Sequence, residues 1–218
     1  ATLDPYAPLL ADKLRVRFYM QRMEAEAALQ AIVRPAEAFG RPFAPGVAES
    51  LVENLRQIRV HGQTRAVVGQ FVEPVQLQVV CYQLWENVRD RPSGPITQDD
   101  LPHGYVDRAL TDFYEDALDE VVQRTGVRER DLRRWFGEQL ITPTETRGLA
   151  LRGPKETAGL PNAAVDLLEG RHLIRVEVRG GAPWYELAHD RLVDPVLQSN
   201  RAWAAARETP LRAAARRW

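Results

Sequence analysis

The residues best placed to do chemistry in this chain are His189 and Asp190. They follow a segment that reads as a β-hairpin, and a helix is predicted to open directly after them. Backbone N–H groups in the first turn of a helix lack partners, and the helix dipole is positive there, so an anion is favoured. The imidazole of His189 is able to donate a hydrogen bond to a phosphate oxygen, and with a pKa near neutrality it would respond to the phosphate. The alternative is a partly buried histidine that caps the hairpin, with Asp190 complementing the helix dipole.

Other catalytic arrangements are missing from the sequence. There is no Gly-x-x-x-x-Gly-Lys-Ser/Thr motif, so the chain lacks a phosphate-binding loop and the usual Ser or Thr ligand for Mg²⁺. The four histidines show no metal-ligand spacing, and the serines lack the context of a nucleophile elbow. We therefore predict that this chain is not an enzyme by itself and holds no metal.

The composition fits one or two compact domains. Hydrophobic residues make up 44% of the 218 residues, and the net charge is −1, which gives no general attraction to nucleic acid or to anionic lipid. The single cysteine, Cys81, excludes an internal disulfide framework, and its place on an apolar helical stripe favours a buried, inert thiol. No apolar run reaches the ~20 residues of a membrane helix. We expect a cytoplasmic protein with no membrane partner.

Helical periodicity dominates the first half of the chain. The clearest apolar stripe has the spacing i, i+3, i+4, i+7, i+8, i+11 and consists of Leu77, Val80, Cys81, Leu84, Trp85 and Val88. Pro74 stands in the first turn of this helix, where a missing N–H costs nothing. Helices are also predicted near residues 25–32 and 47–55, and residues 57–71 read as a loop. Residues 20–90 are therefore predicted to form an all-helical bundle.

The second half changes from helical to alternating periodicity. A long helix over 105–124, ended by Gly126, is followed by helices near 132–140 and 161–169. Apolar and charged residues then alternate, and Gly180-Gly181 supplies the positive φ angles of a tight turn, so a hairpin is predicted over 171–187. Residues 142–160 contain three glycines and two prolines, and a short helix is expected there without a definite position.

The order and spacing of these features resemble the STAND NTPases, signalling ATPases related to the NB-ARC and NACHT proteins, in their large bacterial form. In that family a helical domain and a winged helix follow the nucleotide-binding core. Pro74 matches the proline that packs beside the adenine, and His189-Asp190 match the pair that follows the winged-helix hairpin. Arg15–Met20 looks like the last strand of the core, and Arg147 aligns within the segment before the hairpin. The likeness covers roughly residues 12–203.

The resemblance implies a mainly α fold, a helical bundle followed by a winged helix with one small β-hairpin. The expected parts are the end of the core at 1–20, the helical domain at 21–92, the winged-helix domain with its preceding long helix at 93–200, and a connecting helix at 201–218. Pro74, His189 and Asp190 would bind ADP or ATP held in a longer parent, and the isolated chain is expected to hold no nucleotide. Exchange of ADP for ATP would swing the winged helix about a hinge near 89–95, and the active parent would oligomerise. The implied partners are its own nucleotide-binding core and flanking sensor and effector domains.

Two alternatives belong to other classes of protein. A nucleic-acid-binding winged helix would need a cationic patch, for which the candidates are Arg133, Arg134, Arg147, Arg152, Lys155, Arg175 and Arg179. The predicted recognition helix over 161–169 contains no Arg or Lys, although cationic contacts to phosphate dominate such binding, so nucleic acid is not the expected partner. Nucleic-acid contact is likewise the second reading of the arginine-rich 201–218. The other alternative is a protein-interaction module without a ligand.

Overall fold

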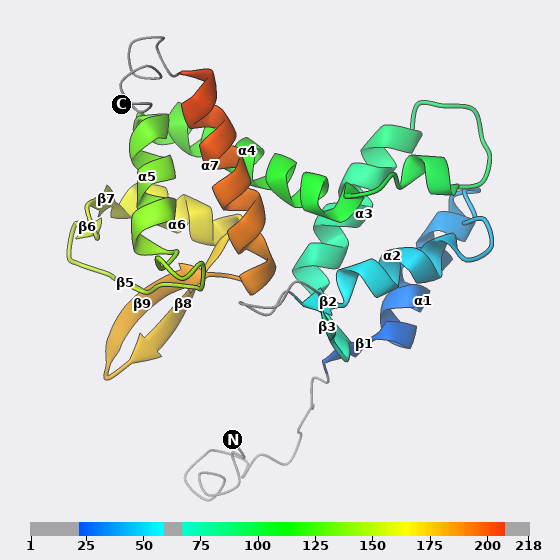
Figure 1. Ribbon diagram of the computed structural model, residues 1–218, viewed down its shortest axis with the longest axis horizontal. Helices are drawn as coiled ribbons and strands as arrows, with labels where there is room; N and C mark the ends of the chain where they lie inside the picture. The colour runs from blue at the N-terminus through cyan, green and yellow to red at the C-terminus, as the bar shows by residue number, and fades with distance from the viewer. Residues whose placement is uncertain (1–21, 59–66, 208–218) are drawn as a thin grey trace, which may run out of the picture.

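The computed structural model describes residues 22–58 and 67–207, which are mainly helical with small antiparallel strand pairs (Figure 1). The helices are α1 (Ala25–Ala38), α2 (Val47–Leu55), α3 (Pro74–Val88), α4 (Tyr105–Thr125), α5 (Glu129–Gln139), α6 (Asn162–Gly170) and α7 (Val193–Ala206), with 3-10 turns η3 (Gln98–Asp100) and η4 (Asp190–Leu192). Helices α1 to α3 form one lobe, α5 to α7 and a small sheet form the other, and α4 runs between them. The prediction of a mainly helical chain with a small β region is confirmed.

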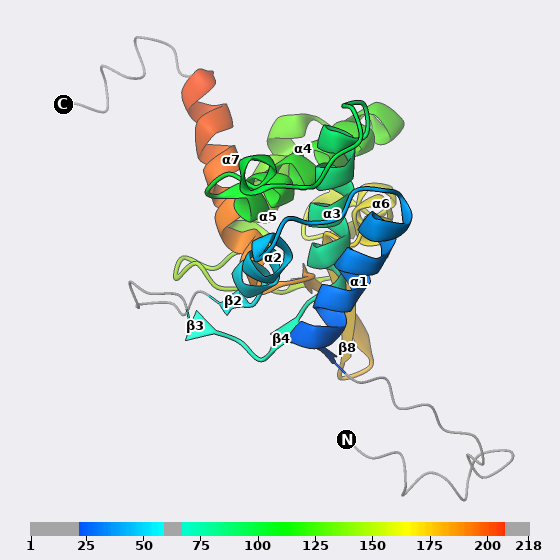
Figure 2. The ribbon, with the colours of Figure 1, turned by 90° about the vertical axis from the view of Figure 1, so that its right-hand side faces the viewer.

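The first lobe is not purely helical, so that part of the prediction is wrong. Strand β1 (Met23–Glu24) pairs with β4 (Phe71–Val72), and β2 (Gln57–Ile58) pairs with β3 (Val67–Val68) (Figure 2). The predicted loop over 57–71 therefore holds strands. The β1–β4 pair joins the entry of α1 to the entry of α3. Strands of two residues carry no alternating pattern, which is why the sequence did not reveal them.

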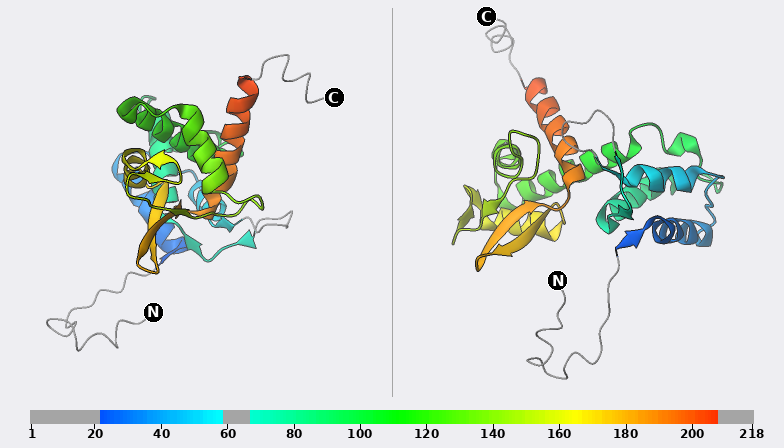
Figure 3. Two further views of the ribbon diagram at one scale, coloured as in Figure 1. Left: turned by 90° about the vertical axis from the view of Figure 1, so that its left-hand side faces the viewer. Right: turned by 60° about the horizontal axis from the view of Figure 1, so that its bottom comes forward.

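The predicted hairpin is confirmed and belongs to a larger sheet. Strands β8 (Ile174–Arg179) and β9 (Ala182–Leu187) pair antiparallel around Gly180 and Gly181, which have φ angles of 58° and 81°. The hairpin projects from the body of the molecule (Figure 3). Strand β5 (Ala150–Leu151) pairs with the other edge of β9, which makes three strands where a lone hairpin was expected.

Residues 142–160 contain no helix, contrary to expectation. Besides β5 they hold β6 (Glu156–Thr157), which pairs with β7 (Leu160–Pro161). The path of the chain here is fixed by close backbone contact. The N–H of Gly148 donates to the carbonyl of Leu140 at 2.8 Å, and a Cβ atom at position 148 would lie 2.6 Å from the carbonyl oxygen of Gln139. This contact between a glycine and the end of α5 has no signature in the local sequence.

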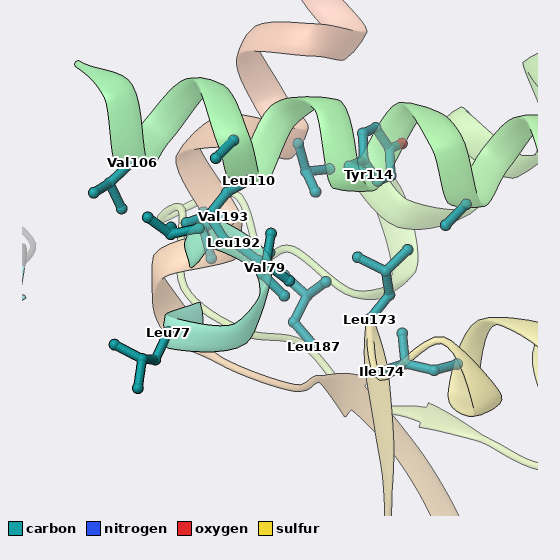
Figure 4. Packing of buried hydrophobic residues seen from close by; sticks show 14 of the residues in the cluster. Leu77, Val79, Val106, Leu110, Tyr114, Leu173, Ile174, Leu187, Leu192 and Val193 are labelled. Atoms are coloured by element: carbon teal, nitrogen blue, oxygen red, sulfur yellow. The ribbon is translucent and has the colours of Figure 1, made fainter. Parts of the chain in front are cut away.

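The apolar core is continuous between the two lobes. Figure 4 shows Val79 of α3, Leu187 of β9, Leu192 of η4 and Val193 of α7 gathered beneath α4, with Leu77 of α3 to one side of them. All five are buried. The expected boundary between residues 92 and 93 therefore does not separate two cores, and α7 runs unbroken across the expected boundary at residue 200.

Helix α3 buries two faces, and the predicted apolar stripe covers only one of them. Four stripe residues are buried, but Cys81 is only partly buried and Trp85 is 38% exposed. Gln76 and Val79 are buried in addition, because this side of α3 faces the other lobe. Burial raises the pKa of the Cys81 thiol to about 11, which keeps it protonated and a poor nucleophile.

The segment expected to act as a hinge is held firmly. The guanidinium of Arg41, which is 7% exposed, donates to the carbonyls of Arg89 at 3.2 Å, Arg91 at 2.6 Å and Pro92 at 3.4 Å. A buried cation that satisfies three carbonyls resists motion of the backbone around it. A hinge at residues 89–95 would have to break these contacts of Arg41, and it stays a prediction.

A buried ionic network fastens α7 to α4 and α5. Arg133 is 5% exposed, forms an ion pair with Glu115, and donates to Glu129 at 2.7 Å and to Ser199 Oγ at 2.7 Å. The amide of Asn200 donates to the Arg133 carbonyl at 3.0 Å. Removing one member of such a network would leave an unpaired buried charge, so α7 is anchored at its middle as well as at its start. Within the described part of the chain, no helix is both long enough and apolar enough to cross a membrane.

We predict that Gly148→Ala destabilises the chain by about 1–3 kcal/mol, because the new methyl group meets a backbone carbonyl that cannot move freely. Gly94→Ala is the matched control, since a Cβ there has no neighbour within 4 Å. Urea unfolding of both variants measures the effect. Equal midpoints for Gly148→Ala and wild type would show that the 142–148 segment does not pack against α5 as described.

Candidate functional site

His189 lies between the end of β9 and a single 3-10 turn. Its backbone is extended, with φ −150° and ψ 148°, and it is the N-cap residue of η4. The expectation that a helix opens directly after the hairpin is corrected: three residues of η4 intervene, and α7 begins at Val193. The N–H of Arg191, which would be free at an open helix start, donates to His189 Nδ1 at 3.1 Å. The turn therefore has one fewer unpaired backbone N–H for an anion than the sequence suggested, so anion binding would depend mainly on the His189 side chain.

The structure brings the first turn of α3 to His189. Pro74 is the first residue of α3 and is exposed, and Gln76, two residues later, is buried with its amide Nε2 2.6 Å from His189 Nδ1. Glu73, just before the proline, has a carboxylate oxygen 3.7 Å from His189 Nε2. The two motifs singled out in the sequence, 115 residues apart, thus share one site, although Pro74 reaches His189 only through its neighbours.

The hydrogen bonds around His189 decide which ring nitrogen carries the proton. The backbone N–H of Arg191 can only donate, so Nδ1 is the unprotonated acceptor. The Gln76 amide nitrogen, 2.6 Å from Nδ1, shares the single lone pair of that atom with the Arg191 N–H. The single proton of the neutral ring remains on Nε2, on the side of the Glu73 carboxylate. The site therefore presents one N–H donor in a fixed direction.

The pKa of His189 is lower than its ordinary value, mainly because burial disfavours the charged ring. The carboxylates of Glu73 and Asp190 act in the opposite direction, and the guanidinium groups of Arg147 and Arg191 add to the lowering. A pKa below the ordinary value favours the neutral ring at pH 7.

Asp190 is held from the side of the 142–148 segment. Its carboxylate accepts from Arg147 Nε at 2.5 Å, and Arg147 Nη1 also donates to Glu186 at 3.1 Å and to the carbonyl of Leu187 at 3.4 Å. Arg147 thus ties the end of the hairpin to the turn that carries His189. Asp190 points to Arg147 and contributes to the site by holding the turn in place.

Arg191 was not identified from the sequence, yet it makes the longest-range contacts of the turn. Its guanidinium donates to the carbonyl of Asn54, to Asn54 Oδ1 at 2.7 Å and to the carbonyl of Gln57 at 3.4 Å, and it lies 3.4 Å from Asp107 Oδ1. These partners belong to α2, β2 and α4. No spacing or periodicity in the sequence links Arg191 to residues 137 positions away.

The hollow beside this turn is small. Its volume is about 150 Å³, and it is lined by Asn54, Gln57, His103, Gly104, Asp107, His189, Asp190, Arg191 and Asp194. Pockets for small-molecule ligands usually measure about 300–1,000 Å³. This hollow is therefore too small to enclose a nucleotide by itself. Of the other histidines, His103 lines this hollow, His172 is exposed, and His61 lies outside the described residues. The described residues contain no group of side chains suited to hold a metal ion.

Comparison of the chain with protein-family models, with curated proteins and with solved structures found no match. The assignment of a function therefore depends on the geometry of the site and on the resemblance described above.

We predict that His189 makes stability depend on pH between its ordinary pKa and its lowered folded-state pKa. In the unfolded chain the ring takes up a proton below about pH 6.5, whereas the folded chain resists this, so stability falls as the pH falls through that window. His189→Asn keeps an acceptor for the Arg191 N–H and removes the titration. Melting curves between pH 7.5 and 5 should show a steeper loss for wild type, by at most about 1.4 kcal/mol per pH unit. Parallel curves for the two proteins would contradict the lowered pKa.

Proposed function

We propose that this chain is the regulatory segment of a STAND-type NTPase, in which the adenine nucleotide of a preceding core controls the position of the second lobe. The observation that carries the proposal is the meeting of the first turn of α3 with His189. In the resemblance, the proline of that turn flanks the base and the histidine reaches the phosphates. Pro74 stands at the start of α3 between Glu73 and Gln76, and these two neighbours approach His189 from the other lobe: Gln76 lies at Nδ1, and the Glu73 carboxylate lies 3.7 Å from Nε2.

The arrangement of the second lobe is consistent with a winged helix. Helix α5, strand β5, helix α6 and the β8–β9 hairpin follow in the order that the resemblance implies, with β5 beside the returning strand β9. The place of a second helix is taken by β6 and β7. Helices α1 to α3 would then be the helical domain, and α4 the long helix that precedes the winged helix.

In the proposed resting state, the neutral imidazole of His189 donates its Nε2–H to a phosphate oxygen of ADP. Glu73 would have to turn away, since its carboxylate and a phosphate would repel each other, and its 53% exposed side chain is free to do so. Binding of ATP would disfavour this contact, the second lobe would separate from α2 and α3, and the parent would oligomerise. The nucleotide biases a two-state balance through its different affinity for the two states.

The chain is proposed to be a sensor without catalytic activity of its own. It lacks the phosphate-binding loop and its lysine, and the hollow beside His189 is too small for a whole nucleotide. Its proposed partners are the nucleotide-binding core, the flanking sensor and effector domains of the parent, and further copies of the parent in the active state.

The nucleic-acid alternative is weakened by the pairing of its candidate cations. Of the seven cationic side chains proposed for the patch, all except Lys155 form ion pairs with acidic side chains. The pairs are Arg133–Glu115, Arg134–Asp131, Arg147–Asp190, Arg152–Asp166, Arg175–Glu186 and Arg179–Glu177. A cation paired with a carboxylate releases little counterion when it meets a phosphate. Helix α6, the candidate recognition helix, contributes Asp166 and Glu169 and no cation.

The proposal predicts that His189→Asn in the parent loses ADP faster than wild type, by roughly ten- to a hundredfold. Asparagine retains the acceptor for the Arg191 N–H but lacks the Nε2–H, whose hydrogen bond to a phosphate contributes ~1.5–3 kcal/mol. His189→Gln, which can place an amide N–H where Nε2–H lies, should retain more ADP than His189→Asn. The measurement is the ADP content after purification and the rate of its release.

Two controls make this comparison specific. His172→Asn replaces an exposed histidine with φ 59°, a conformation that asparagine tolerates, and should behave as wild type. Glu73→Gln removes the charge that competes for Nε2–H, so it should retain ADP at least as well as wild type. Equal ADP retention in His189→Asn, His172→Asn and wild type would leave His189 as a structural cap and favour the ligand-free interaction module.

We predict that the chain binds duplex DNA only non-specifically, with dissociation constants in or above the range of about 10⁻⁶–10⁻⁴ M at physiological salt. Fluorescence anisotropy with unrelated duplexes should give similar curves, because most candidate cations are already paired. Tight, sequence-dependent binding that weakens steeply with salt would place the nucleic-acid reading first.

A further inference from the structure

Arg191 links the turn that carries His189, in the second lobe, to helix α2 in the first lobe. Its side chain is only 13% exposed, and its guanidinium bonds to the backbone and the side chain of Asn54, in the last turn of α2. Carbonyl oxygens in the last turn of a helix lack partners along the helix and lie at its negative end, so a cation is favoured there. Arg191 therefore acts as a C-terminal cap for a helix that ends 136 residues earlier.

The same residue fixes the imidazole through its backbone. The N–H of Arg191 donates to His189 Nδ1, so the position of the Arg191 backbone determines which ring nitrogen is protonated and where Nε2–H points. The side chain of Gln76, from α3, completes the hold on Nδ1. The two ends of Arg191 thus connect the geometry of the ring to the end of α2.

We propose that Arg191 is the positioning residue of His189, and that it releases the ring when the second lobe moves away from α2. Withdrawal of the guanidinium from Asn54 would pull on the three-residue turn η4, which is too short to absorb the displacement. The Arg191 N–H would then leave Nδ1, and Nε2–H would lose its fixed direction. The consequence for nucleotide sensing rests on the proposed function, whereas the positioning itself is independent of any nucleotide.

The test uses the full 218-residue chain labelled with ¹⁵N, without nucleotide. In wild type, the ring resonances of His189 should report one dominant tautomer, with Nδ1 unprotonated, and a pKa below the ordinary value. Arg191→Ala should mix the two tautomers and raise the pKa toward the ordinary value. Amide exchange in η4 and in the last turn of α2 should accelerate together, by roughly tenfold or more.

Arg191→Lys separates position from charge. The lysine keeps the positive charge beside the ring. It lacks the planar guanidinium whose two nitrogens contact the Asn54 carbonyl and the Asn54 side chain at the same time. If Arg191 acts by position, Arg191→Lys mixes the tautomers nearly as Arg191→Ala does. A purely electrostatic effect would leave Arg191→Lys like wild type and would overturn the proposal. Arg201→Ala, which removes an exposed arginine of α7 paired with Glu145, is the control and should change neither signal.

Further measurements keep the proposal testable if Arg191→Ala does not fold. Asn54→Ala removes one acceptor and leaves the arginine in place, so it should shift both signals in the same direction by a smaller amount. In wild type, the amides of η4 and of the end of α2 should show one common opening free energy by hydrogen exchange. Independent openings, or an unchanged His189 tautomer in Asn54→Ala and Arg191→Lys, would overturn the role of Arg191. If the tautomer and the amide exchange behave as expected but ADP retention does not depend on His189, only the nucleotide role is rejected.

Discussion

The arrangement of the two lobes depends on a turn of three consecutive residues, each held by a different part of the chain. His189 accepts from Gln76 of α3, Asp190 accepts from Arg147, and Arg191 donates to Asn54 of α2. Because the three residues are adjacent, displacement of one partner strains the other two contacts. The ring of His189 therefore has a fixed tautomer and direction only while the lobes are in contact.

The turn lies at the edge of the apolar contact between the two lobes beneath α4, and this packing strengthens the polar contacts of the turn. Leu187 before the turn and Leu192 and Val193 after it are buried beneath α4, so the polar contacts of the turn are partly shielded from water. Hydrogen bonds and ion pairs gain strength in such surroundings. The Arg133 network anchors the middle of α7, and Arg41 holds residues 89–92, so buried cations fix the chain on both sides of the turn.

Much of the fold could be predicted from the sequence because its longer elements bury regular stripes. The helix expected near 47–55 is α2, which buries its apolar residues at helical spacing, and the glycines at 180 and 181 mark the hairpin turn. The two-residue strands and the path near Gly148 could not be predicted, because they depend on contacts with distant backbone. The same applies to the site. His189 and Pro74 stood out by local context, whereas Gln76 looked like an ordinary polar helix residue, and Arg191 gave no sign of its partner in α2.

We propose that His189 and the first turn of α3 form one wall of an adenine-nucleotide site in a longer parent. The most direct test is a structure of that parent isolated with ADP. The account predicts His189 Nε2 at hydrogen-bond distance, about 3 Å, from a phosphate oxygen, with Pro74 beside the adenine and Glu73 turned away. A nucleotide bound far from both residues, with Nε2 still facing Glu73 as it does here, would contradict it.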